Sequence, residues 1–134
     1  MPFDGTWFKI DLPTALPAHD KVGKALLLAK TRIETDGWCT YELHDGRAVC
    51  AVGAIEDVTG DEYAILRRGA RRVYEWNDNP GRKQHEVVAL FERAIRDQRR
   101  RKWALTKWGV STSAIGALHR AISYLGDEKS GSRI

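Results

Sequence analysis

The hydrophobic positions along the chain predict a mainly helical protein. Apolar residues recur at helical spacing over residues 20–35, 61–77, 84–100 and 111–125, and we expect an amphipathic helix in each range. Asp20 and Gly37 stand where an N-cap and a C-terminal stop are common. The expected fold is therefore a compact helical bundle.

Residues 38–60 fit more than one structure. The sequence His44-Asp45-Gly46-Arg47 is typical of a turn, and it leaves room for a small β-hairpin near residues 38–52. Residues 48–58 are apolar almost throughout, which fits a buried strand as well as a short buried helix. We favour a short helix that ends at Gly60.

The clearest amphipathic pattern lies in residues 61–77. The apolar face of this expected helix contains Ile65, Leu66, Gly69, Ala70, Val73 and Trp76. The opposite face contains four arginines: Arg67, Arg68, Arg71 and Arg72. Pro80 disfavours helical geometry at Asn79, so the helix should end before it.

The expected organisation is one domain spanning residues 1–134, which is a usual size for a single core. Residues 1–18 hold several prolines and should form an extended arm or a short strand that lies across the core, with Trp7 and Phe8 exposed. We expect a basic linker and a C-terminal helix over residues 98–126, and a disordered tail over 127–134.

Charge is distributed unevenly along the chain. The net charge is +4, but residues 1–60 contain 6 Lys and Arg against 9 Asp and Glu, whereas residues 61–134 contain 16 against 9. A phosphate backbone or an acidic protein would be attracted to the second part. The candidate binding residues are Arg67, Arg68, Arg71, Arg72, Arg96, Arg99, Arg100, Arg101 and Lys102. A solvated helix face is the alternative.

The sequence has no long uncharged apolar run and no apolar stretch of signal-peptide length at its start. We therefore expect a cytoplasmic protein without a membrane partner, in which Cys39 and Cys50 are free thiols.

Residues 104–118 resemble a helix-turn-helix, with Gly109 at the turn. The second helix would begin with Ser111, Thr112 and Ser113, and it offers few side chains that read bases. We favour a structural corner between two helices.

Cys50 is the one weak candidate for catalysis. A thiolate at a helix start near a histidine can act as a nucleophile, but apolar neighbours raise a thiol pKa, so we favour a buried structural cysteine. Cys39, His44, Cys50 and His85 match no zinc-ligand spacing. We therefore expect no metal and no cofactor.

The segment from Trp76 to Arg82 is a candidate turn site, in which Trp76, Asn77, Asp78 and Arg82 could contact a ligand. We favour a structural interpretation. Trp76 should bury its ring under the helix that begins near Lys83, and Asp78 should accept backbone hydrogen bonds from the turn or from that helix.

Two segments carry a resemblance to a known family. GRAVCAVGA at residues 46–54, followed by WNDNPGR at residues 76–82, resembles an uncharacterised domain family of actinobacteria and their phages. Its pattern is GR-x-C-x-x-GA and then WND-x-PGR, and Glu86-Val87 stands where a Glu-Val pair follows. The resemblance covers residues 20–97 and departs at Lys83, where a Thr cap is expected. It implies a phage or actinobacterial origin, and it assigns no function.

These observations favour a small non-enzymatic binding protein that engages an acidic partner, either nucleic acid or a host protein, through its arginine-rich face. One alternative is a small enzyme that uses Cys50. The other is a protein–protein inhibitor that uses the aromatic N-terminal arm.

Overall fold

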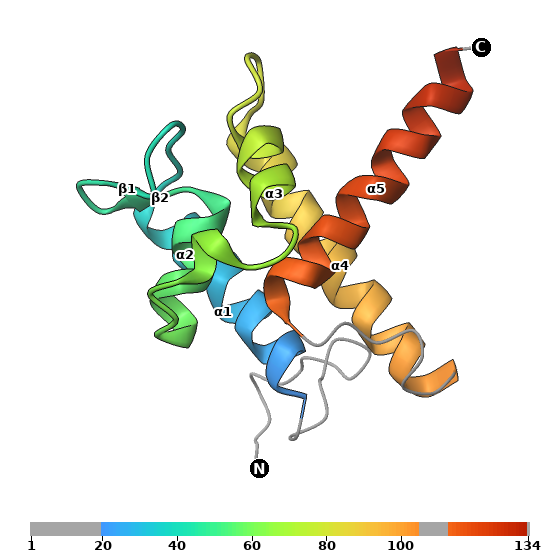
Figure 1. Ribbon diagram of the computed structural model, residues 1–134, viewed down its shortest axis with the longest axis horizontal. Helices are drawn as coiled ribbons and strands as arrows, with labels where there is room; N and C mark the ends of the chain where they lie inside the picture. The colour runs from blue at the N-terminus through green and yellow to red at the C-terminus, as the bar shows by residue number, and fades with distance from the viewer. Residues whose placement is uncertain (1–19, 105–112, 134) are drawn as a thin grey trace.

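Helices form most of the part of the chain that this computed structural model describes, residues 20–104 and 113–133, with side chains for residues 20–99 and 113–125. The elements, in chain order, are α1 (Lys21–Asp36), β1 (His44–Asp45), β2 (Ala48–Val49), α2 (Ala51–Thr59), the short 3₁₀ helix η3 (Ala64–Leu66), α3 (Ala70–Asn77), α4 (Gln84–Ala104) and α5 (Ala114–Arg133) (Figure 1). The mainly helical prediction is confirmed.

Local capping explains where α1 begins and ends. The Asp20 carboxylate accepts a hydrogen bond from the Gly23 N–H at 2.9 Å, which satisfies a donor that a helix start leaves free. Gly37 follows the helix with φ 99°, a conformation that a residue with a side chain rarely adopts. Both ends were predicted correctly.

The predicted hairpin is present and leads directly into a buried helix. β1 pairs antiparallel with β2, with His44 opposite Val49 and Asp45 opposite Ala48. The first five residues of α2 are all buried, which explains why periodicity could not distinguish a helix from a strand. The helix ends at Gly60 in the left-handed conformation, as predicted.

The continuous helix predicted over residues 61–77 is wrong. The chain forms η3, turns, and starts again as α3 after Gly69, whose φ is 90°. A Cβ at Gly69 would lie 3.0 Å from the Cβ of His119, so this bend lets α5 pack closely. As a result, Ile65 and Leu66 are exposed instead of facing the core.

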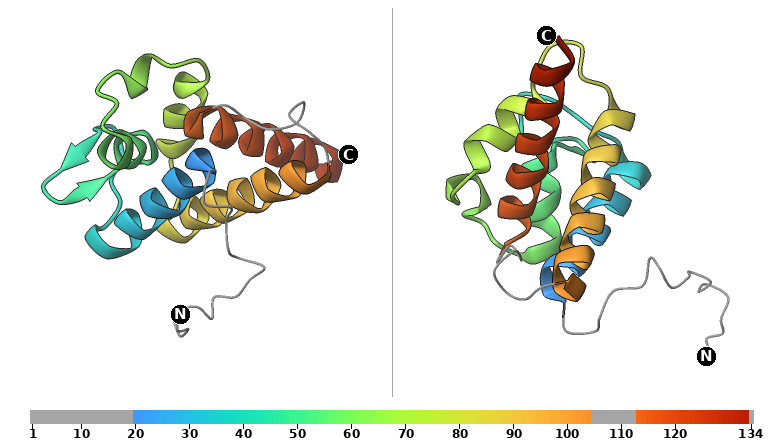
Figure 2. Two further views of the ribbon diagram at one scale, coloured as in Figure 1. Left: turned by 90° about the horizontal axis from the view of Figure 1, so that it is seen from below. Right: turned by 90° about the vertical axis from the view of Figure 1, so that its right-hand side faces the viewer.

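The long helices α1, α4 and α5 pack against one another, and the hairpin, α2 and η3 lie together beside them (Figure 2). Phe91, Leu26, Leu90 and Leu118 are among the largest fully buried side chains of this core. The Ser113 hydroxyl accepts a hydrogen bond from the Gly116 N–H at 3.0 Å at the start of α5. Ser113 therefore caps the start of α5.

Several predictions concern the ends of the chain. α5 runs to Arg133, through most of the segment for which the sequence predicted a disordered tail. The N-terminal arm and the turn of the expected helix-turn-helix lie in residues 1–19 and 105–112, outside the described residues. Among the helices described, none is both long enough and apolar enough to cross a membrane.

Candidate functional site

Three exposed apolar side chains lie on the connection between α2 and α3, and four arginines follow them in the chain. Tyr63 is 58% exposed, Ile65 40% and Leu66 75%, and these are three of the seven large hydrophobic residues that are exposed in the described chain. Arg67, Arg68, Arg71 and Arg72 follow immediately and are also exposed. We call these seven residues the 63–72 surface.

A hydrogen-bonded turn holds the 63–72 surface in place. The Asp61 carboxylate accepts two hydrogen bonds from the Arg67 guanidinium, both at 2.8 Å, and a third from the Tyr63 N–H at 3.1 Å. The bonds from Arg67 are the main reason that the pKa of Asp61 is lowered. The exposed apolar side chains therefore stand on a fixed turn.

A cavity of about 220 Å³ opens beside this turn. Asp61 and Arg67 form part of its lining, and the rest comes from the start of α1, the end of α2 and the start of α5. Val22, Ala25 and Ile115 make much of the wall apolar. The 63–72 surface therefore borders a hollow that could accept an apolar side chain.

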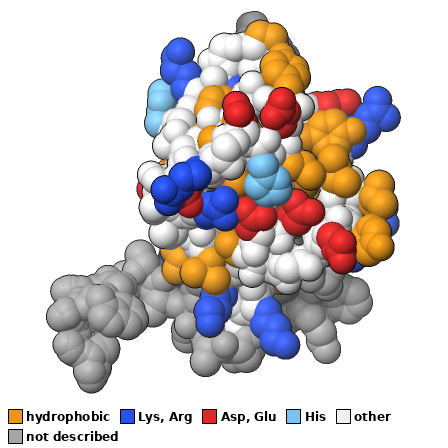
Figure 3. Space-filling view, turned by 90° about the vertical axis from the view of Figure 1, so that its left-hand side faces the viewer, with side chains coloured by type: hydrophobic (Ala, Val, Ile, Leu, Met, Phe, Trp, Pro, Cys, Tyr) orange, Lys and Arg blue, Asp and Glu red, His pale blue; other side chains and the backbone are white. Residues whose placement is uncertain are grey.

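Charge on the 63–72 surface is only partly neutralised. Arg71 pairs with Glu75 at 2.9 Å, and Arg67 pairs with Asp61. Arg68 and Arg72 form no ion pair with any of the described residues. The face drawn in Figure 3 carries acidic, basic and hydrophobic side chains interspersed, with no continuous basic field.

The structure divides the predicted basic residues between two elements. Arg67 and Arg68 lie in the turn between η3 and α3, and Arg71 and Arg72 belong to α3. Arg96 and Arg99 belong to α4. Arg96 is exposed, but Arg99 is half-buried and its Nη1 atom is buried without a hydrogen-bond acceptor. The side chains of Arg100, Arg101 and Lys102 lie outside the described residues.

Asn77 joins three segments of the chain and was not recognised as doing so from sequence. It is fully buried. Its Oδ1 accepts hydrogen bonds from the Trp38 indole N–H at 2.7 Å and from the Ala51 N–H at 3.0 Å. Its Nδ2 donates to the Cys39 carbonyl at 3.2 Å. Asn77 therefore attaches the end of α3 to the loop after α1 and to the start of α2.

The hydrogen bonds of Asp78 differ from the capping role expected for it. Its Oδ1 accepts from the Tyr41 N–H at 2.8 Å, in the loop before β1, and from Asn77 Nδ2 at 2.9 Å. The prediction that Asp78 accepts backbone hydrogen bonds from the turn or from α4 is wrong. At the start of α4, the carboxylate of Glu86 instead accepts from the Lys83 N–H at 2.9 Å. Tyr41 is held with a positive φ of 68°.

Trp76 is half-buried against the core, and Arg82, in the turn before α4, lies over its ring. The guanidinium carbon of Arg82 lies 3.7 Å from the ring centroid, which is a cation–π contact. The Nε of Arg82 also donates to the Trp76 carbonyl at 2.9 Å. The four residues of the candidate turn site therefore have structural contacts that account for their presence.

Cys50 has the environment of a structural cysteine. It is the N-cap of α2, it is only 3% exposed, and its Sγ accepts a hydrogen bond from the Gly53 N–H at 3.3 Å. Burial raises the pKa of the Cys50 thiol, and burial also raises the pKa of Cys39 to about 11. Both thiols are free. This chemistry opposes a thiolate nucleophile near neutral pH.

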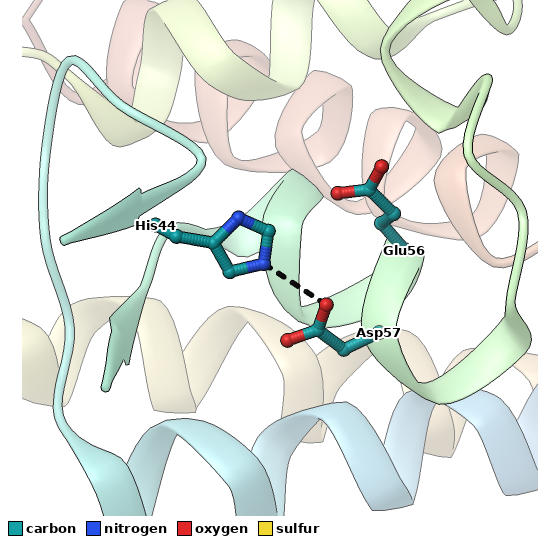
Figure 4. Close-up of side chains that lie close together, drawn as sticks. All are labelled: His44, Glu56 and Asp57. Carbon is teal, nitrogen blue, oxygen red and sulfur yellow. Dashed lines mark hydrogen bonds and ion pairs between the residues drawn. The ribbon is translucent and has the colours of Figure 1, made fainter. Parts of the chain in front are cut away.

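The structure brings His44 to two carboxylates that sequence reasoning missed. Figure 4 shows the His44 imidazole, on the hairpin, facing Glu56 and Asp57 of α2. The His44 Nε2 lies 2.9 Å from Asp57 Oδ1, and one ligand atom from each of the three residues lies within 4.8 Å of the others. The adjacent acidic pair at 56–57 is visible in the sequence, but its proximity to His44 depends on how the hairpin packs on α2.

Comparison with known proteins gives one positive result. Neither the curated proteins nor the solved structures contain a match to the chain. A family model matches residues 17–97, which include α1, the hairpin, α2, η3, α3 and most of α4. This range agrees with the span of the resemblance seen in the sequence. The chain therefore belongs to DUF6197, a family of unknown function.

Proposed function

We propose that the protein is a non-enzymatic binding module whose 63–72 surface engages an acidic partner protein. The observation that carries the proposal is the exposure of Tyr63, Ile65 and Leu66 on a fixed turn, directly beside Arg68 and Arg72. Tyr and Arg are enriched at protein interfaces, and exposed apolar side chains that are clustered mark contact surfaces. The partner would offer carboxylates around an apolar centre.

The same residues favour a protein over nucleic acid. Four arginines in residues 61–75 are accompanied by Asp61, Glu62 and Glu75, so the segment has a net charge of only +1. Proteins that bind phosphate backbones rely on several unneutralised cations. Large aliphatic side chains such as Leu66 gain little from phosphates, whereas a protein surface can bury them.

Two synthetic acidic polymers and a DNA duplex test the chemistry of the partner directly. Fluorescence anisotropy would measure the affinity of the full chain for a random Glu–Tyr copolymer, for polyglutamate and for the duplex. We expect the Glu–Tyr copolymer to bind most tightly, because it supplies both carboxylates and apolar rings. Leu66→Ser should weaken this binding about tenfold, which is typical of losing a central interface contact.

Matched control variants distinguish binding at the 63–72 surface from non-specific electrostatic or hydrophobic binding elsewhere on the protein. Leu28 lies on α1 and is 45% exposed, so Leu28→Ser should leave the affinity unchanged. Arg68→Glu combined with Arg72→Glu should abolish binding, whereas Arg96→Glu on α4 should not. Tightest binding to the duplex would instead support a nucleic-acid partner, and equal losses in Leu66→Ser and Leu28→Ser would contradict the proposed surface.

A further inference from the structure

His44, Glu56 and Asp57 form a group of metal-ligating side chains that shares no residue with the 63–72 surface. His44 comes from β1, and the two acidic residues come from the last turns of α2 (Figure 4). Each residue offers one ligand atom, and these three atoms lie within 4.8 Å of one another. Imidazole nitrogen together with carboxylate oxygen is a donor set that zinc accepts.

Glu56 supplies a second observation. Its Oε1 atom is buried, yet it accepts no hydrogen bond. A buried carboxylate oxygen without a donor is costly, and the large majority of buried polar atoms are paired. The nearby His44 ring does not donate to this oxygen, and the Asp57 carboxylate next to it can only accept. A cation bound to the Glu56 carboxylate would offset this cost.

Arg32 prepares Asp57 for such a role. The Arg32 Nη1 donates to Asp57 Oδ2 at 2.7 Å, whereas Oδ1 faces His44. The Arg32 Nε also pairs with Asp36 at 2.7 Å, so its position is fixed from both sides. Hydrogen-bonding partners behind a ligating carboxylate orient it in known metal sites. One oxygen of Asp57 is therefore held and the other remains directed at the cluster.

The spacing requires only small movements. Zinc binds nitrogen and oxygen ligands at about 2.0–2.2 Å, so two ligand atoms on one tetrahedral ion lie about 3.4 Å apart. The separation of 2.9 Å between His44 Nε2 and Asp57 Oδ1 would open slightly. The three ligand atoms lie within 4.8 Å of one another, so rotation of the side chains would bring them around the ion. His44 and Glu56 both have solvent access through which an ion and a water ligand can enter.

We propose that His44 Nε2 and one carboxylate oxygen each from Glu56 and Asp57 bind a divalent transition-metal cation, with zinc the best match. The imidazole ligand favours zinc over magnesium and calcium, which prefer oxygen alone. A bound cation would cross-link the hairpin to α2. The cysteines take no part, because Cys39 and Cys50 are buried with their own hydrogen bonds.

Zinc titration of the chelator-treated full chain by calorimetry tests this site. We expect one zinc per chain, with His44→Ala and Glu56→Gln each weakening the affinity about tenfold or more, because each removes one of three ligands. His85→Ala and Glu62→Gln remove exposed groups elsewhere and should leave it unchanged. Circular dichroism of each variant without metal establishes that it is folded.

Cobalt absorption identifies the ligand atoms. Cobalt(II) bound to nitrogen and oxygen shows visible bands without the near-ultraviolet sulfur-to-metal band that a thiolate ligand produces, and this is the spectrum we expect. The proposal is overturned by a sulfur band, by zinc binding that survives both His44→Ala and Glu56→Gln in folded protein, or by no zinc binding at millimolar concentration. The cluster would then be a hydrogen-bonded link between hairpin and helix.

Discussion

At the scale of single residues, Asn77 is a buried side chain that satisfies three polar groups from two other segments of the chain. Its amide satisfies the Trp38 indole, the Ala51 N–H and the Cys39 carbonyl at once, in a place that water does not reach. A buried polar group left without a partner costs about 1–3 kcal/mol. The structural role of the WND segment therefore rests mainly on its asparagine.

Asn77→Ala should lower the free energy of unfolding by about 3 kcal/mol or more, because three buried groups lose their partner together. Urea denaturation followed by circular dichroism measures this. Asn79→Ala, two residues along on the exposed turn, is the matched control and should change stability by less than about 0.5 kcal/mol. Similar stabilities of the two variants would show that Asn77 is not the central link.

Residue-scale features were predictable where their cause is local. Asp20, Gly37 and Gly60 act on the helix ends beside them, so composition and position are sufficient to identify them. The sequence places Asn77 only in a turn, because its hydrogen bonds reach Trp38 and Cys39, which are far from it along the chain. The same holds for Asp78, whose acceptor role is determined by the loop before β1.

At the scale of elements, the hairpin and α2 approach each other at one glycine. A Cβ placed on Gly53 would lie 2.2 Å from the Leu43 carbonyl oxygen and 3.0 Å from its carbon. These are backbone atoms, so no side-chain rotation can relieve the overlap. The Cys50 N–H donates to the same carbonyl at 3.1 Å, which holds the loop over the start of α2.

Gly53→Ala should therefore destabilise the protein by about 2 kcal/mol or more, because overpacking against backbone forces the elements apart. Gly116→Ala is a useful control. There the nearest atom is the Ser113 hydroxyl at 3.1 Å, on a side chain that can adjust, and helix propensity gains up to about 1 kcal/mol from the change. Differential scanning calorimetry should give a clearly lower melting temperature for Gly53→Ala alone, and equal values would contradict the close approach.

Helices could be predicted from the sequence where the spacing of apolar residues matches the face that is buried. In α1 the apolar residues at helical spacing include Leu26, Ala29 and Ile33, which are buried. The prediction of one helix over residues 61–77 failed because it placed Ile65 and Leu66 on the same buried face as Val73, whereas both are exposed. The break at Gly69 depends on the approach of His119 from α5, which no local pattern records.

At the scale of the whole molecule, three exposed large hydrophobic side chains lie on the connection between α2 and α3, next to four exposed arginines. The long helices pack with their apolar sides inward, whereas η3 presents Tyr63 and Leu66 to solvent beside Arg68 and Arg72. The sequence located the arginines but not their apolar neighbours, because the expected helix placed those inside. The interface proposal therefore combines a charge pattern visible in the sequence with an exposure that only the fold determines.

Site-specific photocrosslinking tests this central claim most directly. A benzoylphenylalanine placed at Leu66 or, as control, at Leu28 would be irradiated in the cells from which the protein comes. We predict an adduct with an acidic protein from position 66 only. It should resist nuclease and disappear when Arg68→Glu and Arg72→Glu are added. An adduct that is nucleic acid, that forms equally at position 28, or that survives both charge reversals would contradict the account, as would no adduct at position 66.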